Sequence, residues 1–154
     1  MDDFNFKDFE QYLVQGEPDK KKKTYAWQTA IGLQAVDNLK PSDYLIETAK
    51  KNIEGEISIK EAQNLIKTYY ETKRSKDEDD EAKEEADIVS SHITELLSED
   101  SFSFTPLEFL NIHKRLFTGV FKFAGKIRDV NITKKEWVLQ GDTVYYSGYD
   151  LIQK

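Results

Sequence analysis

The sequence predicts a mainly α-helical protein that ends in a β-hairpin. Two observations favour this fold class. Between Thr24 and Phe117, apolar residues recur three and four positions apart in successive segments, which is the spacing of one face of a helix. From Lys126 onward, β-branched and aromatic residues dominate instead, and a Gly-Asp turn separates two runs of them. The chain therefore changes from helix to hairpin near its end.

Length and composition limit the classes of function. A chain of 154 residues fits one domain, or one domain with a small helical extension. Its 29 acidic and 22 basic residues give a net charge of −7, which disfavours nucleic acid and anionic membranes as partners. Without cysteine and with two histidines, neither a disulfide framework nor a metal cluster is expected. The N-terminus has no apolar run of signal-peptide or membrane-span length, so a cytoplasmic protein is expected.

The first 23 residues are interpreted as an N-terminal segment and a linker. Apolar side chains at Phe4, Phe6, Phe9 and Leu13 indicate a short docking helix within residues 2–15. Residues 16–23, GEPDKKKK, form the linker. Its four consecutive lysines are typical of a solvated charge run beside acidic neighbours, and a nucleic-acid patch is the less favoured interpretation.

Three short helices are expected in residues 24–72. The first runs from a Thr24 cap to Asp37 and Asn38, because asparagine tolerates the left-handed conformation that helix ends need. The second opens at Pro41-Ser42 and ends at Gly55. The third opens with the capping box Ser58-Ile-Lys-Glu61, and the three helices are expected to form one compact unit.

Residues 73–85, KRSKDEDDEAKEE, lack apolar periodicity and are the best candidate for a domain boundary. They are either a charged linker or the polar start of the next helix. The apolar face of that helix is expected at Ala86, Val89, Ile93, Leu96 and Leu97. A second capping box, Thr105-Pro-Leu-Glu108, opens the last long helix, and Gly119 is its expected stop.

The hairpin is predicted from eight β-forming residues. Lys134-Lys135-Glu136 and the Gly141-Asp142 turn interrupt them, and a short helix is expected from about Ser147. The β-forming residues are Ile127, Val130, Ile132, Trp137, Val138, Val144, Tyr145 and Tyr146.

The segment IHKRLFTGVFKFAGKIRDVNITKKEW, residues 112–137, resembles the part of Fic-domain proteins that leads into the flap. The similarity lies in a helix ending at Phe117, an Ala-Gly-x-x-Arg turn at residues 124–128 and a following hairpin. It implies that residues 86–154 are the N-terminal part of a Fic-type helical bundle. It also implies that a target protein docks on the flap by strand addition. The implied docking residues are Ile132, Thr133, Lys134, Lys135, Glu136 and Trp137.

Residues 30–71 resemble the three-helix antitoxin module that blocks Fic enzymes. That module carries a Ser/Thr-x-x-x-Glu-Gly/Asn signature whose glutamate pairs with an active-site arginine. The resemblance places the glutamate position at Asp37, the next position at Asn38 and the hydroxyl position at Leu33. Aspartate is one methylene shorter and leucine cannot donate a hydrogen bond. Both departures predict weakened or lost inhibition.

Two other segments offer parts of the same signature. Ile53-Glu54-Gly55 contains Glu-Gly, but Lys50 stands at the hydroxyl position and the glycine is explained as a helix stop. Ser91 and Glu95 have the right spacing, but Leu96 follows them. Asp37 is therefore the favoured inhibitory position.

The catalytic loop of the family, His-x-Phe-x-x-Gly-Asn-x-Arg, does not occur in this sequence. His113 is not its histidine, because no Phe, Gly-Asn or Arg follows at the needed spacing, and a structural or solvated role is expected for it. No catalytic residue and no cofactor are therefore expected in this chain. The resemblance implies ATP and Mg²⁺ for a complete Fic domain.

These observations leave three hypotheses. The first is the N-terminal part of a Fic AMP-transferase, a nucleotidyltransferase, divided into residues 1–23, an antitoxin-like module at 24–72, a charged linker at 73–85 and the Fic part at 86–154. Its partners are a target protein and the missing C-terminal half. The second is a stand-alone, non-enzymatic remnant that binds a Fic partner. The third is an acidic helical domain unrelated to Fic proteins. Oligomeric state is not predicted.

Overall fold

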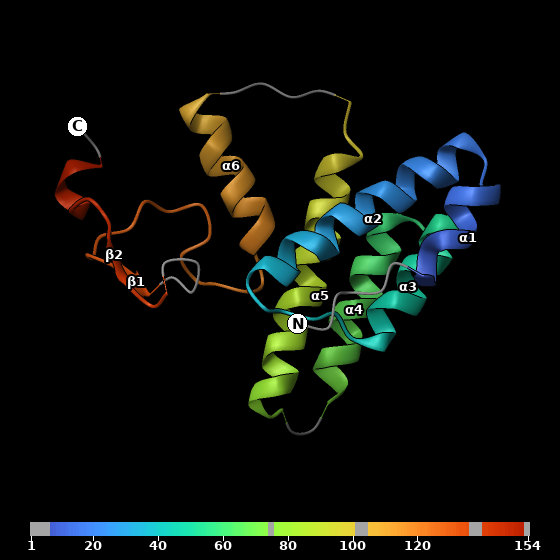
Figure 1. Cartoon of the computed structure of the whole chain (residues 1–154), viewed down its shortest axis with the longest axis horizontal. Helices are drawn as coiled ribbons and strands as arrows, with labels where there is room; N and C mark the ends of the chain where they lie inside the picture. The colour runs from blue at the N-terminus through green and yellow to red at the C-terminus, as the bar shows by residue number, and fades with distance from the viewer. Residues whose placement is uncertain (1–6, 74–75, 101–104, 136–139, 153–154) are drawn as a thin grey trace. The chain divides into compact units, whose positions relative to one another are not determined.

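A computed structural model describes residues 7–73, 76–100, 105–135 and 140–152 of the chain. Within these ranges it contains six α-helices and one two-stranded antiparallel sheet, which confirms the predicted mainly helical fold with a small hairpin (Figure 1). Its internal contacts divide the chain into two compact units, Met1–Ser103 and Phe104–Lys154. They are called the first and second units below, and each is described by itself.

The first unit is a helical bundle with one hydrophobic core. Its helices are α1 (Lys7–Gln15), α2 (Pro18–Val36), α3 (Asp43–Ile53), α4 (Ile59–Thr72) and α5 (Glu78–Leu97). α2 packs against α1, α3 and α5, and α4 packs against α3 and α5. The predicted docking helix is present as α1, whose Phe9 and Tyr12 enter the core, whereas Phe4 and Phe6 lie outside the described residues. The buried core residues are Phe9, Tyr12, Trp27, Ile31, Leu45, Ile46, Ala49, Ile53, Ile66 and Tyr70.

Three predicted helix ends in the first unit are confirmed. Asn38, just beyond α2, has a φ of 58°, in the left-handed region. The Ser42 side chain accepts a hydrogen bond from the backbone N–H of Leu45 at the start of α3. Ser58 and Glu61 make both reciprocal bonds of the capping box that opens α4. Each of these signals acts within a few residues, so each can be recognised in the sequence.

The predicted linker at residues 16–23 is wrong from Pro18 onward, because α2 begins there. Proline suits the first helical position, and Asp19 in the first turn forms an ion pair with Lys23 one turn later. Lysine is also a good helix former. Thr24, the expected cap, is buried within the helix and donates its hydroxyl hydrogen to the backbone carbonyl of Lys20.

The charged run at residues 73–85 is helical from Glu78, so its second half is the polar start of α5. The Asp77 side chain caps this helix by accepting a hydrogen bond from the backbone N–H of Asp80. Four acidic residues in the first turn also interact favourably with the helix dipole. α5 therefore belongs to the first unit, and α1 and α5 complete the core of α2, α3 and α4. The predicted assignment of separate roles to residues 1–23, 24–72, 73–85 and 86–154 stays a prediction.

The buried face of α5 differs from the predicted apolar face. Ala86 and Val89 are buried as expected, but Leu97 is exposed, and Ile93 and Leu96 are only partly buried. The helix instead buries four polar residues against its neighbours, namely Asp87, Ser90, Ser91 and Thr94. Small polar side chains permit close approach of helices, and hydropathy alone does not select them.

The second unit contains α6 (Pro106–Phe117), strands β1 (Thr133–Lys135) and β2 (Thr143–Tyr145), and a 3₁₀ turn, η2 (Tyr149–Leu151). The Thr105 side chain accepts a hydrogen bond from the backbone N–H of Glu108, which confirms the predicted cap. β1 includes Lys134 and Lys135, which were predicted to interrupt the strand. An exposed strand can carry lysines because neither of its faces needs to be apolar. The short helix expected from Ser147 is reduced to the single turn η2.

Candidate functional site

The α2–α3 turn, residues 37–42, contains the two residues predicted to regulate a Fic partner. α2 ends at Val36, and the backbone N–H groups of Asp37 and Asn38 donate to the carbonyls of Gln34 and Ala35. Asp37 and Asn38 are both exposed. The structure therefore places the predicted inhibitory carboxylate at an exposed helix end.

An exposed stripe on α2 leads to this turn. It consists of Tyr25, Thr29, Leu33 and Val36, which lie on one face because they are spaced four, four and three residues apart. Its three apolar members are each more than half exposed. The opposite face of the same helix buries Trp27, Ala30 and Ile31. A helix that is apolar on two faces is typical of an element covered from both sides.

A second carboxylate accompanies Asp37. Partial burial raises the pKa of the Glu85 carboxyl on α5, and the negative charge of Asp37 raises it further. The carboxylates of Asp37 and Glu85 therefore interact unfavourably with each other at the end of α2. Within the described ranges, no three histidine, cysteine, aspartate or glutamate side chains are grouped so that they could hold a metal ion.

Replacing Asp37 with asparagine is expected to lower the pKa of Glu85, because the neutral side chain no longer opposes a second negative charge. NMR titration of the Glu85 carboxyl measures the change. Asp19→Asn, at the other end of α2, is the matched control and should leave the Glu85 titration where it is. An unchanged Glu85 pKa in Asp37→Asn would mean that the two carboxylates do not interact.

A buried carboxylate, Asp87 of α5, anchors the other end of the α2–α3 turn. Its side chain is fully buried. Oδ1 accepts from the backbone N–H of Ser42 at 2.9 Å, and Oδ2 accepts from the Ser42 hydroxyl at 2.5 Å and from the Tyr70 hydroxyl at 2.6 Å. Burial raises the pKa of the Asp87 carboxyl, and these three donors oppose that rise. Sequence reasoning missed this residue, although an aspartate between Ala86 and Val89 on a buried face was a visible signal.

Four of the six predicted docking residues lie in the described part of the second unit, in β1 or directly before it. β1 pairs with β2 in an antiparallel register that sets Thr133 opposite Tyr145 and Lys135 opposite Thr143. All three residues of β1 are exposed, as is Ile132 before it. In the described part of the sheet, β1 has β2 as its only neighbour, which leaves its other edge open. Glu136 and Trp137, also predicted for docking, lie outside the described residues.

Two polar side chains hold the base of the hairpin together. The Arg128 guanidinium donates to the carbonyl of Val130 at 2.8 Å and also to the carbonyl of Ser147. The Asn131 side-chain oxygen accepts from the backbone N–H of Tyr149 at 3.0 Å. Arg128 is the arginine of the Ala-Gly-x-x-Arg turn. In this chain it ties the two ends of the hairpin to each other.

His113 has the structural role that was expected for it. Its Nδ1 accepts a hydrogen bond from the backbone N–H of Gly125 at 2.8 Å, so this nitrogen carries no proton in that arrangement. Its ring also lies against Phe117 and Phe123. His113 thus fixes the turn that precedes the hairpin against α6.

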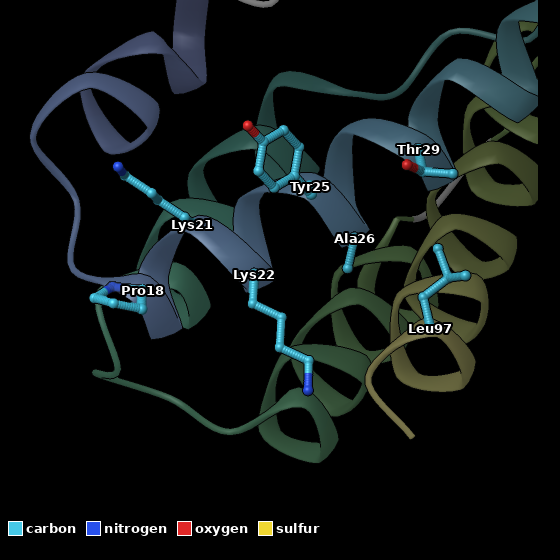
Figure 2. A pocket seen from close by; sticks show the side chains of 7 residues that line it. All are labelled: Pro18, Lys21, Lys22, Tyr25, Ala26, Thr29 and Leu97. Carbon is cyan, nitrogen blue, oxygen red and sulfur yellow. The ribbon is translucent and has the colours of Figure 1, made fainter. Parts of the chain in front are cut away.

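A pocket of about 600 Å³ lies in the first unit between α2 and the C-terminal end of α5 (Figure 2). It contains none of the predicted regulatory residues. Its lining consists of Pro18, Lys21, Lys22, Tyr25, Ala26, Thr29 and Leu97.

No protein-family model, curated protein or solved structure matches the chain. The resemblance to Fic proteins therefore rests on the residues quoted above alone. Among the described residues, no helix has both the length and the apolar character needed to cross a membrane.

Proposed function

We propose that this chain is the N-terminal part of a Fic-family AMP-transferase with a built-in inhibitory module, and that the chain alone is catalytically incomplete. In such an enzyme, AMP passes from Mg-ATP to a hydroxyl group of a target protein. The first unit supplies the inhibitory segment, and the second unit supplies the strand on which the target docks. ATP and Mg²⁺ bind to the catalytic half, which contains the loop that this chain lacks.

The exposed stripe of α2 is the observation that carries the proposal. Tyr25, Leu33 and Val36 are each more than half exposed on one face of α2, and this face ends next to Asp37. Exposed apolar faces of this kind mark surfaces that another protein body covers. A body that covers this stripe meets Asp37 at its end. That is the arrangement an inhibitory helix needs.

The second unit supports the incomplete character of the chain. α6 has no buried residue, although Leu107 and Phe109 are among its apolar side chains and are strongly exposed. A helix of 12 residues and a two-stranded sheet are both marginal in water without packing partners. In the proposed enzyme, the catalytic half packs against α6 and the two-stranded sheet.

The open edge of β1 suits the proposed docking of a target. An extended segment can add to such an edge through main-chain hydrogen bonds, which require no particular side chains. Lys134 and Lys135, both exposed, lie on this strand. Charged residues on an edge strand also oppose unspecific aggregation, so Lys134 and Lys135 keep the free strand soluble when no target is bound.

A stand-alone interaction protein is the second candidate, and one observation favours it. The first unit has a core of its own, built around Trp27, Ile31 and Tyr70. Such a unit is able to present Asp37 to a separate Fic partner without any help from the second unit. In this version the chain regulates and does not catalyse.

We expect no AMP transfer by the chain, because the histidine base and the phosphate-binding loop are both absent from its sequence. Incubation with labelled ATP, Mg²⁺ and a cell lysate measures this. A reaction without the chain is the control. Labelled protein bands that depend on the chain would refute the prediction.

Reading the coding sequence past codon 154 separates the two candidates. An in-frame His-x-Phe-x-x-Gly-Asn-x-Arg loop supports the AMP-transferase. A stop codon at that point supports the interaction protein.

A further inference from the structure

We infer that the pocket between α2 and the C-terminal end of α5 is a docking groove for an acidic amphipathic helix of another protein. This role concerns the surface of the first unit alone and does not rest on the proposed function. Two residues of the lysine run at 20–23 line the groove, so the run has a place in this role.

The pocket extends along α2. Its α2 residues recur every three or four positions from Pro18 to Thr29, so they share one face of the helix over three turns. At a rise of about 1.5 Å per residue, this face is about 16 Å long. A volume of about 600 Å³ is within the usual range of binding sites. A groove of this length suits an elongated segment better than a compact small molecule.

Apolar side chains from both helices line the groove. Ala26 is buried, whereas Tyr25 and Leu97 are 59% and 46% exposed. In Figure 2, Leu97 is on the α5 side of the pocket, and Ala26 and Thr29 are on the α2 side. A bulky apolar residue of a partner that enters between the two helices therefore removes Tyr25 and Leu97 from water, which favours binding.

Lys21 and Lys22 add positive charge to the same groove. Among the described residues, Lys21 makes no ion pair. Lys22 Nζ lies 3.2 Å from a carboxylate oxygen of Asp100, just beyond α5, so this lysine already holds a carboxylate. Both members of the pair are strongly exposed, so water screens their attraction, and a carboxylate of a partner is able to replace Asp100 at little cost.

The charge of the whole chain favours a protein helix over other anionic occupants. An anionic membrane or a nucleic acid contacts a wide surface and meets a chain of net charge −7. A helix that fits into one groove meets mainly the charge of that groove. An amphipathic helix with glutamates beside its apolar stripe offers both chemistries that the groove requires, namely apolar anchors and carboxylates.

Amide NMR spectra of the 154-residue chain, titrated with amphipathic peptides of about 12 residues, test this role. Acidic peptides carry glutamates beside leucine or phenylalanine at helical spacing. Basic peptides have lysines in place of the glutamates, and a third set has alanine in place of the apolar residues. The acidic peptides are expected to shift the amide signals of Tyr25, Ala26, Thr29 and Leu97 at millimolar concentration or below. The other two sets should leave these signals nearly unchanged.

Charge reversal tests the two lysines. Lys21→Glu combined with Lys22→Glu is expected to weaken binding of the acidic peptides at least about tenfold, because two attractions become repulsions. Lys51→Glu combined with Lys67→Glu, at exposed positions of α3 and α4, is the control with the same change of net charge. It should weaken binding less than about threefold. Lys22 and Lys67 each belong to an exposed ion pair, which makes the two variants comparable.

Leu97→Ser tests the apolar side of the groove, and Leu65→Ser on α4 is its control at 37% exposure. Only Leu97→Ser is expected to weaken the acidic peptides, by about tenfold.

Three outcomes would overturn the docking role. They are the absence of shifts at the groove with every acidic peptide, equal binding of acidic and basic peptides, and sedimentation of the chain with phosphatidylserine vesicles when no acidic peptide binds. None of these experiments involves AMP transfer, so the docking role can fail while the proposed function stands.

Discussion

Replacing Trp27 with alanine is expected to lower the free energy of unfolding of the first unit by about 3–5 kcal/mol. The Trp27 side chain is 0% exposed and lies in the core. Its indole N–H donates to the Asn52 side-chain oxygen at 3.0 Å within the core. The substitution leaves a large cavity and an unpaired acceptor, and each of these costs stability.

The loss extends beyond the cavity, because Asn52 also donates to the carbonyl of Ile57 at 3.1 Å. Trp27 therefore supports the connection between α3 and α4 as well as the core. Urea unfolding followed by far-ultraviolet circular dichroism measures the change. Tyr25→Ala, on the exposed face of the same helix, is the control and should stay within about 0.5 kcal/mol of the wild type. Equal losses of unfolding free energy in Trp27→Ala and Tyr25→Ala would contradict the assignment of Trp27 to the buried face and Tyr25 to the exposed face of α2.

Replacing Gly125 with alanine is expected to disrupt the turn before the hairpin. Gly125 has a φ of +72°, which costs an L-residue about 1–2 kcal/mol. In addition, an added Cβ would lie 2.6 Å from the Cβ of Lys114 on α6, so the turn and the helix would have to separate. The hydrogen bond from the Gly125 N–H to His113 would then be lost, and the hairpin would lose its attachment to α6.

Gly119→Ala provides a matched control for this substitution. Gly119 has a φ of +85°, but nothing lies within 4 Å of an added Cβ. Gly119→Ala therefore has the conformational cost of a positive φ, but its added Cβ does not collide with a neighbouring atom. NMR detects the difference through the exchange rate of the amide at position 125 and through cross-strand contacts between Thr133 and Tyr145. Retention of both signals in Gly125→Ala would show that the close approach to Lys114 does not hold the turn.

The sequence predicted the order of helices well because their ends depend on local bonds. Ser42, Ser58 and Thr105 cap helices by accepting from backbone groups three residues later. Asn38 ends α2 through its own backbone conformation. The same local reasoning placed Asp37 and Asn38 at the end of a helix, where the structure has them.

Local reasoning failed for the lysines at residues 20–23, which were interpreted as a linker, and for residues 73–85 it left a linker and the start of a helix open. The lysines at residues 20–23 and the acidic residues at 78–81 have no apolar periodicity, yet both lie in helices. Pro18 and Asp77 start these helices, and the burial of the later turns stabilises them. A helix whose polar first turns precede a buried half therefore looks like a linker when only its hydropathy is considered.

By itself, the sequence determined the mainly helical class, most helix ends and the hairpin near the C-terminal end, because these depend on interactions over a few residues. Only the tertiary structure decided which face of α5 is buried and that Asp87 anchors the α2–α3 turn. The partners of Asp87 are Ser42 and Tyr70, which lie 45 and 17 positions away in the chain. A bond between such distant residues forms only when three helices pack together, and no pattern along the chain encodes that contact.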